Sequence, residues 1–148
     1  MDIYDSLLSA VHDEYDRIRL IKKSERGEVS LIRHKASGNR YIFRHFSGSS
    51  EVYRKLLPVS CPNLPQIMEV GEKEGKTVLL EEYVQGDTLG ELLQGGLLTA
   101  AQARQITRQL CMALWVLHSM GVVHRDVKPD NVIIRGTEAV LIDFDASR

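Results

Sequence analysis

The chain has 148 residues, of which 43% are hydrophobic and 26% charged, and its formal net charge is −1 at pH 7. These values are typical of a globular domain and give no general attraction to nucleic acid or to an anionic membrane surface, and we expect no nucleic-acid partner. No stretch reaches the roughly 20 apolar residues of a membrane span, and the acidic N-terminus lacks a signal-peptide pattern. Cys61 and Cys111 lie far apart in the sequence, which favours a reduced, cytoplasmic setting over a disulfide scaffold or a zinc site.

The first half of the sequence predicts a helix followed by strands. Apolar residues at helical spacing over residues 3–11 indicate an amphipathic helix. The runs RIRLIKK, EVSLIRHK and RYIFRHF are strand-like, and the ASGN between the last two is typical of a hairpin turn. A short helix capped by Ser49 or Ser50 should end at Pro58, before two more strands paired across EKEGK.

The composition changes after Val84. QGDTLGELLQGG is typical of a linker entering a short helix, and a long helix should begin after Thr99 and stop at Gly121. Two short strands, VIIRG and AVLIDF, follow around a GTE turn. The predicted fold class is therefore α+β, with a strand-rich part over residues 1–84 and a helix-led part over residues 85–148. One apolar face of the long helix comprises Ile106, Leu110, Ala113, Leu114 and Leu117.

Polar side chains with phosphotransfer chemistry gather near the C-terminal end. Asp126 and Asn131 lie in HRDVKPDN, which Pro129 marks as a loop, and Asp143 ends an apolar strand. A carboxylate and a carboxamide suit Mg²⁺, which prefers oxygen ligands and completes its shell with substrate phosphates. Asp126 could orient a hydroxyl nucleophile while Lys128 supplies positive charge to a transferring phosphoryl group. Any one of these residues alone would be read as part of a solvated turn.

The joint pattern is far more specific than its parts. A helix, H-R-D-x-K-P-x-N, a hairpin and then D-F resembles the catalytic and magnesium loops of eukaryotic-type serine/threonine protein kinases, in the form that bacteria also carry. The resemblance implies that Asp126 is the catalytic aspartate and that Asn131 and Asp143 hold Mg²⁺. Lys128 matches the serine/threonine version of the loop. Tyrosine kinases and small-molecule kinases of the aminoglycoside phosphotransferase type usually lack this lysine.

The resemblance extends upstream through nearly the whole chain. VLLEEYVQGDTL is similar to the connection between the two kinase lobes, so Glu82 and Val84 would present backbone groups to the adenine of ATP. Glu81 would take the gatekeeper position, which is usually apolar. The helix that begins near Ser50 resembles helix αC, with Glu51 as its ion-pairing glutamate. Glu51 could instead be only a favourable acid in a first helical turn.

The first strands depart from the kinase pattern. In KKSERGEV, Gly27 and Val29 match the last glycine and the valine of the glycine-rich loop, whereas Lys22 and Ser24 replace its first two glycines. The loop should therefore close less tightly over phosphates. The basic residues around it could supply side-chain charge in place of the missing glycines, or could simply protect an exposed edge strand from pairing.

Two further departures affect the phosphate and metal sites. Arg44 stands where the family's phosphate-binding lysine belongs, and this exchange is not conservative because the guanidinium is longer, planar and forked. Arg44 could still bridge Glu51 and a phosphate in altered geometry. Asp145 replaces the glycine of D-F-G and should restrict that turn. It could also bind a second cation or repel the triphosphate.

We therefore expect a kinase N-lobe, comprising a five-stranded antiparallel sheet and helix αC, followed by a partial, helix-led C-lobe. The implied activity is ATP- and Mg²⁺-dependent phosphorylation of serine or threonine in a protein. The alternatives are a pseudokinase or interaction module and, second, a small-molecule kinase. Kinase domains continue well past D-F-G, so we expect an incomplete domain with little or no activity of its own. A natural short protein that self-associates through the uncovered face of the long helix is the other possibility.

Overall fold

The structure is a computed structural model that describes residues 2–148. It divides into two compact units. The N-terminal unit comprises residues 1–59 and 66–83, and the C-terminal unit comprises residues 60–65 and 84–148. None of the helices in the described part of the chain combines the length and apolar character needed to cross a membrane.

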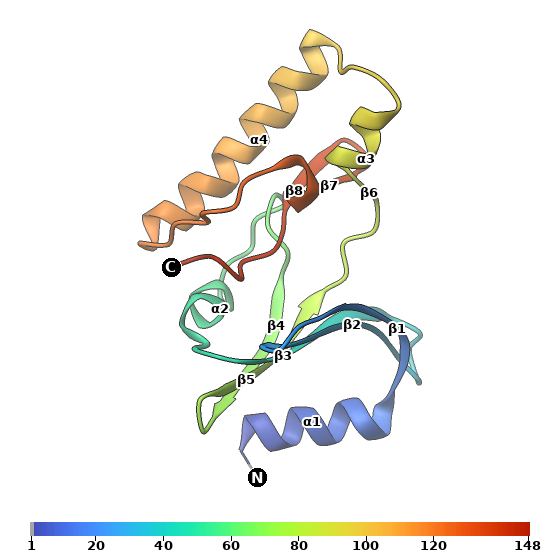
Figure 1. Cartoon of the computed structure of the whole chain (residues 1–148), viewed down its shortest axis with the longest axis vertical. Helices are drawn as coiled ribbons and strands as arrows, with labels where there is room; N and C mark the ends of the chain where they lie inside the picture. Colours follow the sequence, from blue (N-terminus) through green and yellow to red (C-terminus); the bar gives the residue numbers. More distant parts are fainter. Residues whose placement is uncertain (1) are drawn as a thin grey trace. The chain divides into compact units, whose positions relative to one another are not determined.

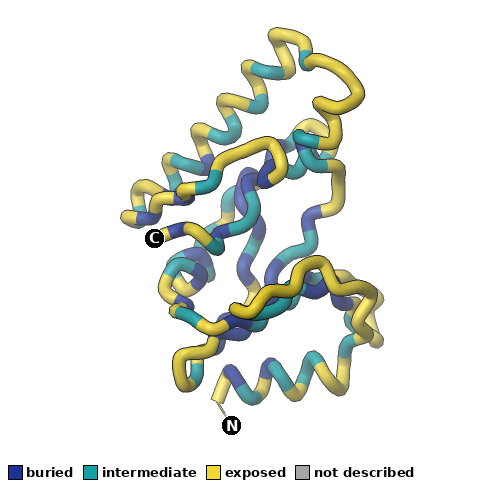
Figure 2. Tube along the Cα trace, in the orientation of Figure 1, coloured by how far each residue is buried: buried dark blue, intermediate teal, exposed yellow. Residues whose placement is uncertain are grey.

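The N-terminal unit is built on a five-stranded sheet in the order β1-β2-β3-β5-β4, in which every neighbouring pair is antiparallel (Figure 1). This architecture confirms the predicted α+β fold. The edge strand β1 is exposed along almost its whole length, as expected for a basic edge strand (Figure 2). The strands are β1 (Tyr15–Lys23), β2 (Gly27–His34), β3 (Arg40–Ser47), β4 (Ile67–Lys73) and β5 (Lys76–Glu82).

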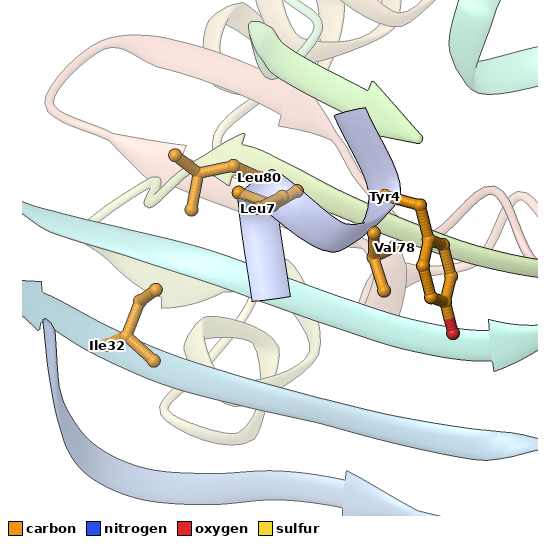
Figure 3. Packing of buried hydrophobic residues seen from close by; sticks show 5 residues of the cluster. All are labelled: Tyr4, Leu7, Ile32, Val78 and Leu80. Atoms are coloured by element: carbon orange, nitrogen blue, oxygen red, sulfur yellow. The ribbon is translucent and has the colours of Figure 1, made fainter. Parts of the chain in front are cut away.

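Helix α1 (Ile3–Glu14) covers one face of this sheet. Asp2 caps the helix, because its side chain accepts a hydrogen bond of 2.8 Å from the backbone N–H of Asp5. Tyr4 and Leu7 are the buried residues of the helix. They pack in one cluster with Ile32 of β2 and with Val78 and Leu80 of β5, as Figure 3 shows.

Helix α2 (Glu51–Leu56) follows β3, with Ser50 at its N-cap position. The Ser50 side chain makes no capping bond. Instead the hydroxyl of Ser49 accepts the backbone N–H of Glu51 at 3.1 Å. The backbone N–H of Ser50 donates to Oε1 of Glu72 at 2.7 Å, which ties the start of α2 to β4 and lowers the pKa of that carboxyl.

The C-terminal unit contains the small antiparallel sheet β6-β7-β8, together with α3 and α4. Thr99 caps α4 in a reciprocal pair with Gln102, and the helix ends beside Gly121, whose φ of 74° requires glycine's freedom. Most of α4 is exposed or half-buried (Figure 2), and its buried residues are Ala113 and Leu117. The elements are β6 (Asp87–Thr88), α3 (Leu89–Gln94), α4 (Ala100–Ser119), the short 3₁₀ turn η1 (Pro129–Asn131), β7 (Val132–Arg135) and β8 (Glu138–Leu141).

Residues 60–65 belong to the C-terminal unit, although they precede β4 in the sequence. The buried amide Nδ2 of Asn63 donates to Oε1 of Gln109 and to the carbonyl of Ala139, both at 2.9 Å. The Asn63 carbonyl accepts the N–H of Leu141 at 3.0 Å. The sequence division at residue 84 therefore differs from the structure by this segment. Strand β6, which the sequence indicated only as a linker, is the second difference.

Candidate functional site

Three of the predicted site residues meet in the loop between α4 and β7. Nδ2 of the buried Asn131 donates to the carbonyl of Asp126 at 2.9 Å and to its Oδ2 at 3.1 Å. Nζ of Lys128 lies 3.7 Å from the same Oδ2. The Asp126 carboxylate is therefore fixed on one side by an amide and faces a cation on the other, while both charged side chains remain partly open to solvent.

The side chain of His124 is buried next to this loop, and the residue is only 1% exposed. Its Nδ1 accepts the backbone N–H of Asp126 at 3.1 Å, so Nε2 carries the proton that it donates to the carbonyl of Ile142 at 2.9 Å. The ring also packs edge-on against Phe144, with centroids 5.6 Å apart. The sequence analysis missed this role, although His124 belongs to the H-R-D motif that identified the loop.

The segment after β8 carries Asp143 and is joined to the loop by a backbone bond of 2.9 Å from Ile142 N–H to the Asn131 carbonyl. Asp143 adopts left-handed backbone geometry, with φ 65°. The backbone N–H of Asp145 donates to Oδ1 of Asp143 at 3.2 Å. Asp145 itself does not have a positive φ, so the left-handed residue of this turn is Asp143. Asp145, which the sequence analysis expected to restrict this turn, therefore stands at a position where glycine's positive φ is not used.

Asn131 and Asp143 have the donor chemistry that Mg²⁺ requires. Because Nδ2 of Asn131 is used by Asp126, its Oδ1 points away from that contact, and it accepts no hydrogen bond from the described residues. Asp143 keeps Oδ2 without a described donor. Within residues 2–148 no group of three His, Cys, Asp or Glu side chains is placed to hold a metal. An amide oxygen and a carboxylate fit a hard cation that takes few protein ligands.

In the N-terminal unit, Arg44 forms a buried ion pair that the sequence analysis did not anticipate. Its Nε donates to Oε1 of Glu81 at 2.9 Å, and the two side chains are 9% and 3% exposed. The sequence signal was Glu81 itself, a charged residue that directly follows the apolar residues VLL of a strand. Arg44 was expected to pair with Glu51, but Glu51 is 74% exposed and lies 3.6 Å from Lys55, one turn further along α2. In the part of the chain that the structure describes, no ion pair joins Arg44 to Glu51.

Gly27 and Val29 lie on β2, and both pair with residues of β3. Gly27 is opposite Phe46, and a Cβ at residue 27 would collide with the carbonyl oxygen of His45, so glycine is required by the close approach of the strands. Val29 is directly opposite Arg44. The turn before Gly27 is closed by backbone bonds in both directions with Ser24, of 2.9 and 3.2 Å.

Arg26, one of the basic residues considered as a substitute for loop glycines, is used within the sheet. Its Nε donates to the carbonyl of Ser47 at 3.0 Å, and its guanidinium lies 5.2 Å from the centre of the Phe46 ring. The charge of Arg26 therefore packs against the end of β3. This contact favours a structural role over phosphate binding.

Glu82 is the last residue of β5, and Val84 follows two residues later. The backbone N–H of Glu82 donates to the carbonyl of Gln66 at 2.8 Å, and its side chain accepts the N–H of Gln66 at 2.9 Å. The buried Val84 has no backbone hydrogen bond from its N–H to any residue that the structure describes. The predicted contact between this N–H and adenine stays a prediction.

The sequence matches known proteins over most of its length. A family described as the protein kinase domain matches residues 11–148. Serine/threonine-protein kinase pkn2 of Myxococcus xanthus is 35% identical over 99 residues, which cover 64% of this chain and 12% of that protein. Sperm motility kinase 1 of Mus musculus is 30% identical over 146 residues, or 92% of this chain and 30% of the relative. Rho-associated protein kinase 1 of Homo sapiens is 27% identical over 144 residues, or 89% and 11%.

The chain thus spans less than a third of the length of these relatives. The match includes both the five-stranded sheet and the loop that holds Asp126, Lys128 and Asn131. It confirms the family that these motifs indicated. The chain belongs to the protein kinase domain family, with a bacterial serine/threonine-protein kinase and two mammalian kinases among its relatives.

Proposed function

We propose that the protein takes part in ATP- and Mg²⁺-dependent transfer of phosphate to serine or threonine hydroxyls of proteins. The observation that carries the proposal is the loop in which Asn131 holds the Asp126 carboxylate and Lys128 lies 3.7 Å away. A carboxylate fixed in this way can accept a hydrogen bond from a substrate hydroxyl and orient its oxygen for attack. The neighbouring ammonium supplies positive charge where charge on the phosphoryl group must be stabilised.

Asn131 and Asp143 would hold Mg²⁺ through the amide Oδ1 and the carboxylate Oδ2, the oxygens that their internal hydrogen bonds leave available. When bound, the ion neutralises phosphate charge. The contribution of the chain is to position these oxygens. The bond between Ile142 N–H and the Asn131 carbonyl fixes the two ligand-bearing segments to each other.

On the nucleotide side, Arg44 would contact phosphate and Val29, opposite it on β2, would contact the base or ribose. The carbonyl of Glu82 and the N–H of Val84 would bond the adenine edge. Gly27 would allow the turn before β2 to approach the phosphates, in addition to its packing role. Glu51 drops out of the proposed phosphate site, because its carboxylate is exposed and paired with Lys55.

Calorimetric titration of ATP, with and without Mg²⁺, tests this proposal directly. We expect binding that strengthens with Mg²⁺, and in Asp143→Asn we expect that Mg²⁺-dependent gain to be lost. Asp87→Asn is the matched control, since it removes an exposed carboxylate from β6 and should change nothing. Mg²⁺-dependent binding that survives in Asp143→Asn would contradict the assignment of the metal ligand. Absence of ATP binding by the folded chain would contradict the proposed function.

A second candidate is an interaction module that does not transfer phosphate. The buried Arg44–Glu81 pair favours it, because the guanidinium is already engaged by a carboxylate. Arg44→Lys separates the two functions. A measurable rise in phosphorylation of generic protein substrates would identify a weak kinase, whereas no transfer by either form would favour the module. Small hydroxylated compounds assayed in parallel test the small-molecule alternative, which Lys128 opposes.

Self-association and a cytoplasmic location remain predictions. The outer surface of α4 exposes Met112 and Trp115, while Leu110 and Leu114 are only half-buried. Apolar surface of this kind is typical of a contact that another chain or segment covers. Sedimentation of the chain at increasing concentration, beside Trp115→Ala, measures whether a second copy is that partner.

A further inference from the structure

The pair formed by Arg44 and Glu81 lies on the sheet face that α1 does not cover. Val78 and Leu80 of β5 pack against α1, so Leu79 and Glu81, which alternate with them, face the opposite side. In the register of β3 and β5, Arg44 is opposite Leu79 and Ile42 is opposite Glu81. Arg44 and Glu81 are therefore diagonal neighbours across the two strands, a spacing that long side chains can bridge.

The apolar surroundings of this pair require each of the two charges to keep its partner. Leu31, Ile42 and Leu79 share that face of the sheet and are themselves buried. A charge in such surroundings is tolerated only with a partner, and removing one member leaves the other uncompensated. Because the acceptor is on a neighbouring strand, the position of the guanidinium is set by the β3–β5 register.

Helix α2 does not contribute the partner carboxylate. Glu51, the acid in its first turn, is exposed and is engaged with Lys55 on the same helix. A displacement of α2 would therefore leave the bond between Nε of Arg44 and Oε1 of Glu81 intact.

We propose that Glu81 is the positioning residue for Arg44 in nucleotide binding. It orients the guanidinium from within the sheet, so that triphosphate recognition does not depend on α2 or on Glu51. This inference rests on the proposed nucleotide-binding function. The Nε–H is used by Glu81, and a guanidinium carries further N–H donors on its terminal nitrogens, in a fork that suits phosphate oxygens.

Two glutamate-to-glutamine exchanges form a matched test. Glu81→Gln keeps the size of the side chain and removes its charge, and Glu51→Gln does the same at the exposed site. Affinities for Mg²⁺·ATP and for adenosine are measured by calorimetry for both variants and for the unchanged chain. We expect Glu81→Gln to weaken ATP binding about tenfold, the loss of one well-placed charge-assisted contact. Adenosine binding should change less than about twofold, and Glu51→Gln should leave both affinities unchanged.

The double variant Arg44→Met/Glu81→Leu separates positioning from folding. Replacing a buried ion pair by apolar side chains of similar size usually preserves stability, so this variant should unfold at a denaturant concentration close to that of the unchanged chain. Its preference for ATP over adenosine should nevertheless be lost. Thus a structural role alone would predict wild-type nucleotide preference in the double variant.

Several results would overturn the inference. Equal or tighter ATP binding in Glu81→Gln would show that Glu81 competes with phosphate for Arg44. A tenfold loss in Glu51→Gln would return the role to α2. An unchanged ATP preference in the double variant would remove Arg44 from phosphate recognition while leaving the proposed function intact. Failure of the unchanged chain to bind ATP would instead refute the proposed function and the inference with it.

Discussion

The buried ring of His124 connects the loop of Asp126 with the segment that carries Asp143. His124→Phe keeps a ring of similar size and its edge contact with Phe144. The exchange removes the acceptor for Asp126 N–H and the donor to the Ile142 carbonyl. Both backbone groups then lose their partner at a partly buried site.

The expected loss of stability follows from those two bonds. A single intramolecular hydrogen bond contributes about 1 kcal/mol net, and a buried group left without a partner costs about 1–3 kcal/mol. Because the Asp126 N–H is only partly buried, we expect the free energy of unfolding to fall by about 2–4 kcal/mol in total. The carboxylate of Asp126 should also lose its fixed orientation, which would reduce any phosphate transfer.

Urea unfolding followed by far-ultraviolet circular dichroism measures this loss. Fluorescence is less suitable, since the single tryptophan, Trp115, is 68% exposed. With a slope of about 2 kcal/mol per molar urea, the midpoint should fall by about 1–2 M. His118→Phe, at an exposed position near the end of α4, is the control and should change the midpoint little. A decrease below about 1 kcal/mol in His124→Phe, at an unchanged slope, would refute the proposed support of the loop by this ring.

Three further predictions concern stability. Leu117→Ala should lower the free energy of unfolding by about 2–5 kcal/mol, because Leu117 is fully buried in α4. Trp115→Ala, on the exposed surface, should change it by no more than about 0.5 kcal/mol. Similar losses for the two variants in thermal or urea unfolding would contradict the packing described. Gly27→Ala should lower the melting temperature by several degrees, because the added methyl group collides with the backbone of β3, and an unchanged melting temperature would refute that close approach. Glu72→Gln should destabilise the chain at neutral pH, because the folded-state pKa of Glu72 is lowered by the N–H of Ser50. The stabilisation by the ionised Glu72 carboxylate is present above the unfolded-state pKa and is lost as the pH falls through the lowered folded-state pKa. The difference in free energy of unfolding between the variant and the unchanged chain should therefore vanish in acid and should not grow there.

Much of the local structure could be predicted from the sequence, because each signal acts over a few residues. Thr99 and Gly121 bound α4 as expected, since capping and positive φ are local requirements. The hairpin of β4 and β5 turns at Glu74 and Gly75, within the predicted EKEGK. The sequence likewise placed Asp126 and Asn131 in one loop, and the structure adds the hydrogen bond between them.

Contacts between distant segments were decided only by the tertiary structure. Glu81 was recognised as an unusual charge, but its pairing with Arg44 depends on the register of β3 and β5, which brings together residues 37 positions apart. The placement of Asn63 in the C-terminal unit depends on bonds to α4 and β8. Glu51 satisfied the local pattern of an ion-pairing acid, yet the folded helix turns it to solvent beside Lys55.

The sequence by itself determined which chemical groups the chain carries and the short-range order in which it presents them. Periodicity, caps and turn residues report interactions between near neighbours, so they specify elements and the loop of Asp126. The partner of a buried charge is determined by strand register and by which faces are covered, and these arise only when the whole sheet is assembled. In this protein the register of β3 and β5 pairs Arg44 with Glu81 of the sheet, and Glu51 of α2 is not its partner.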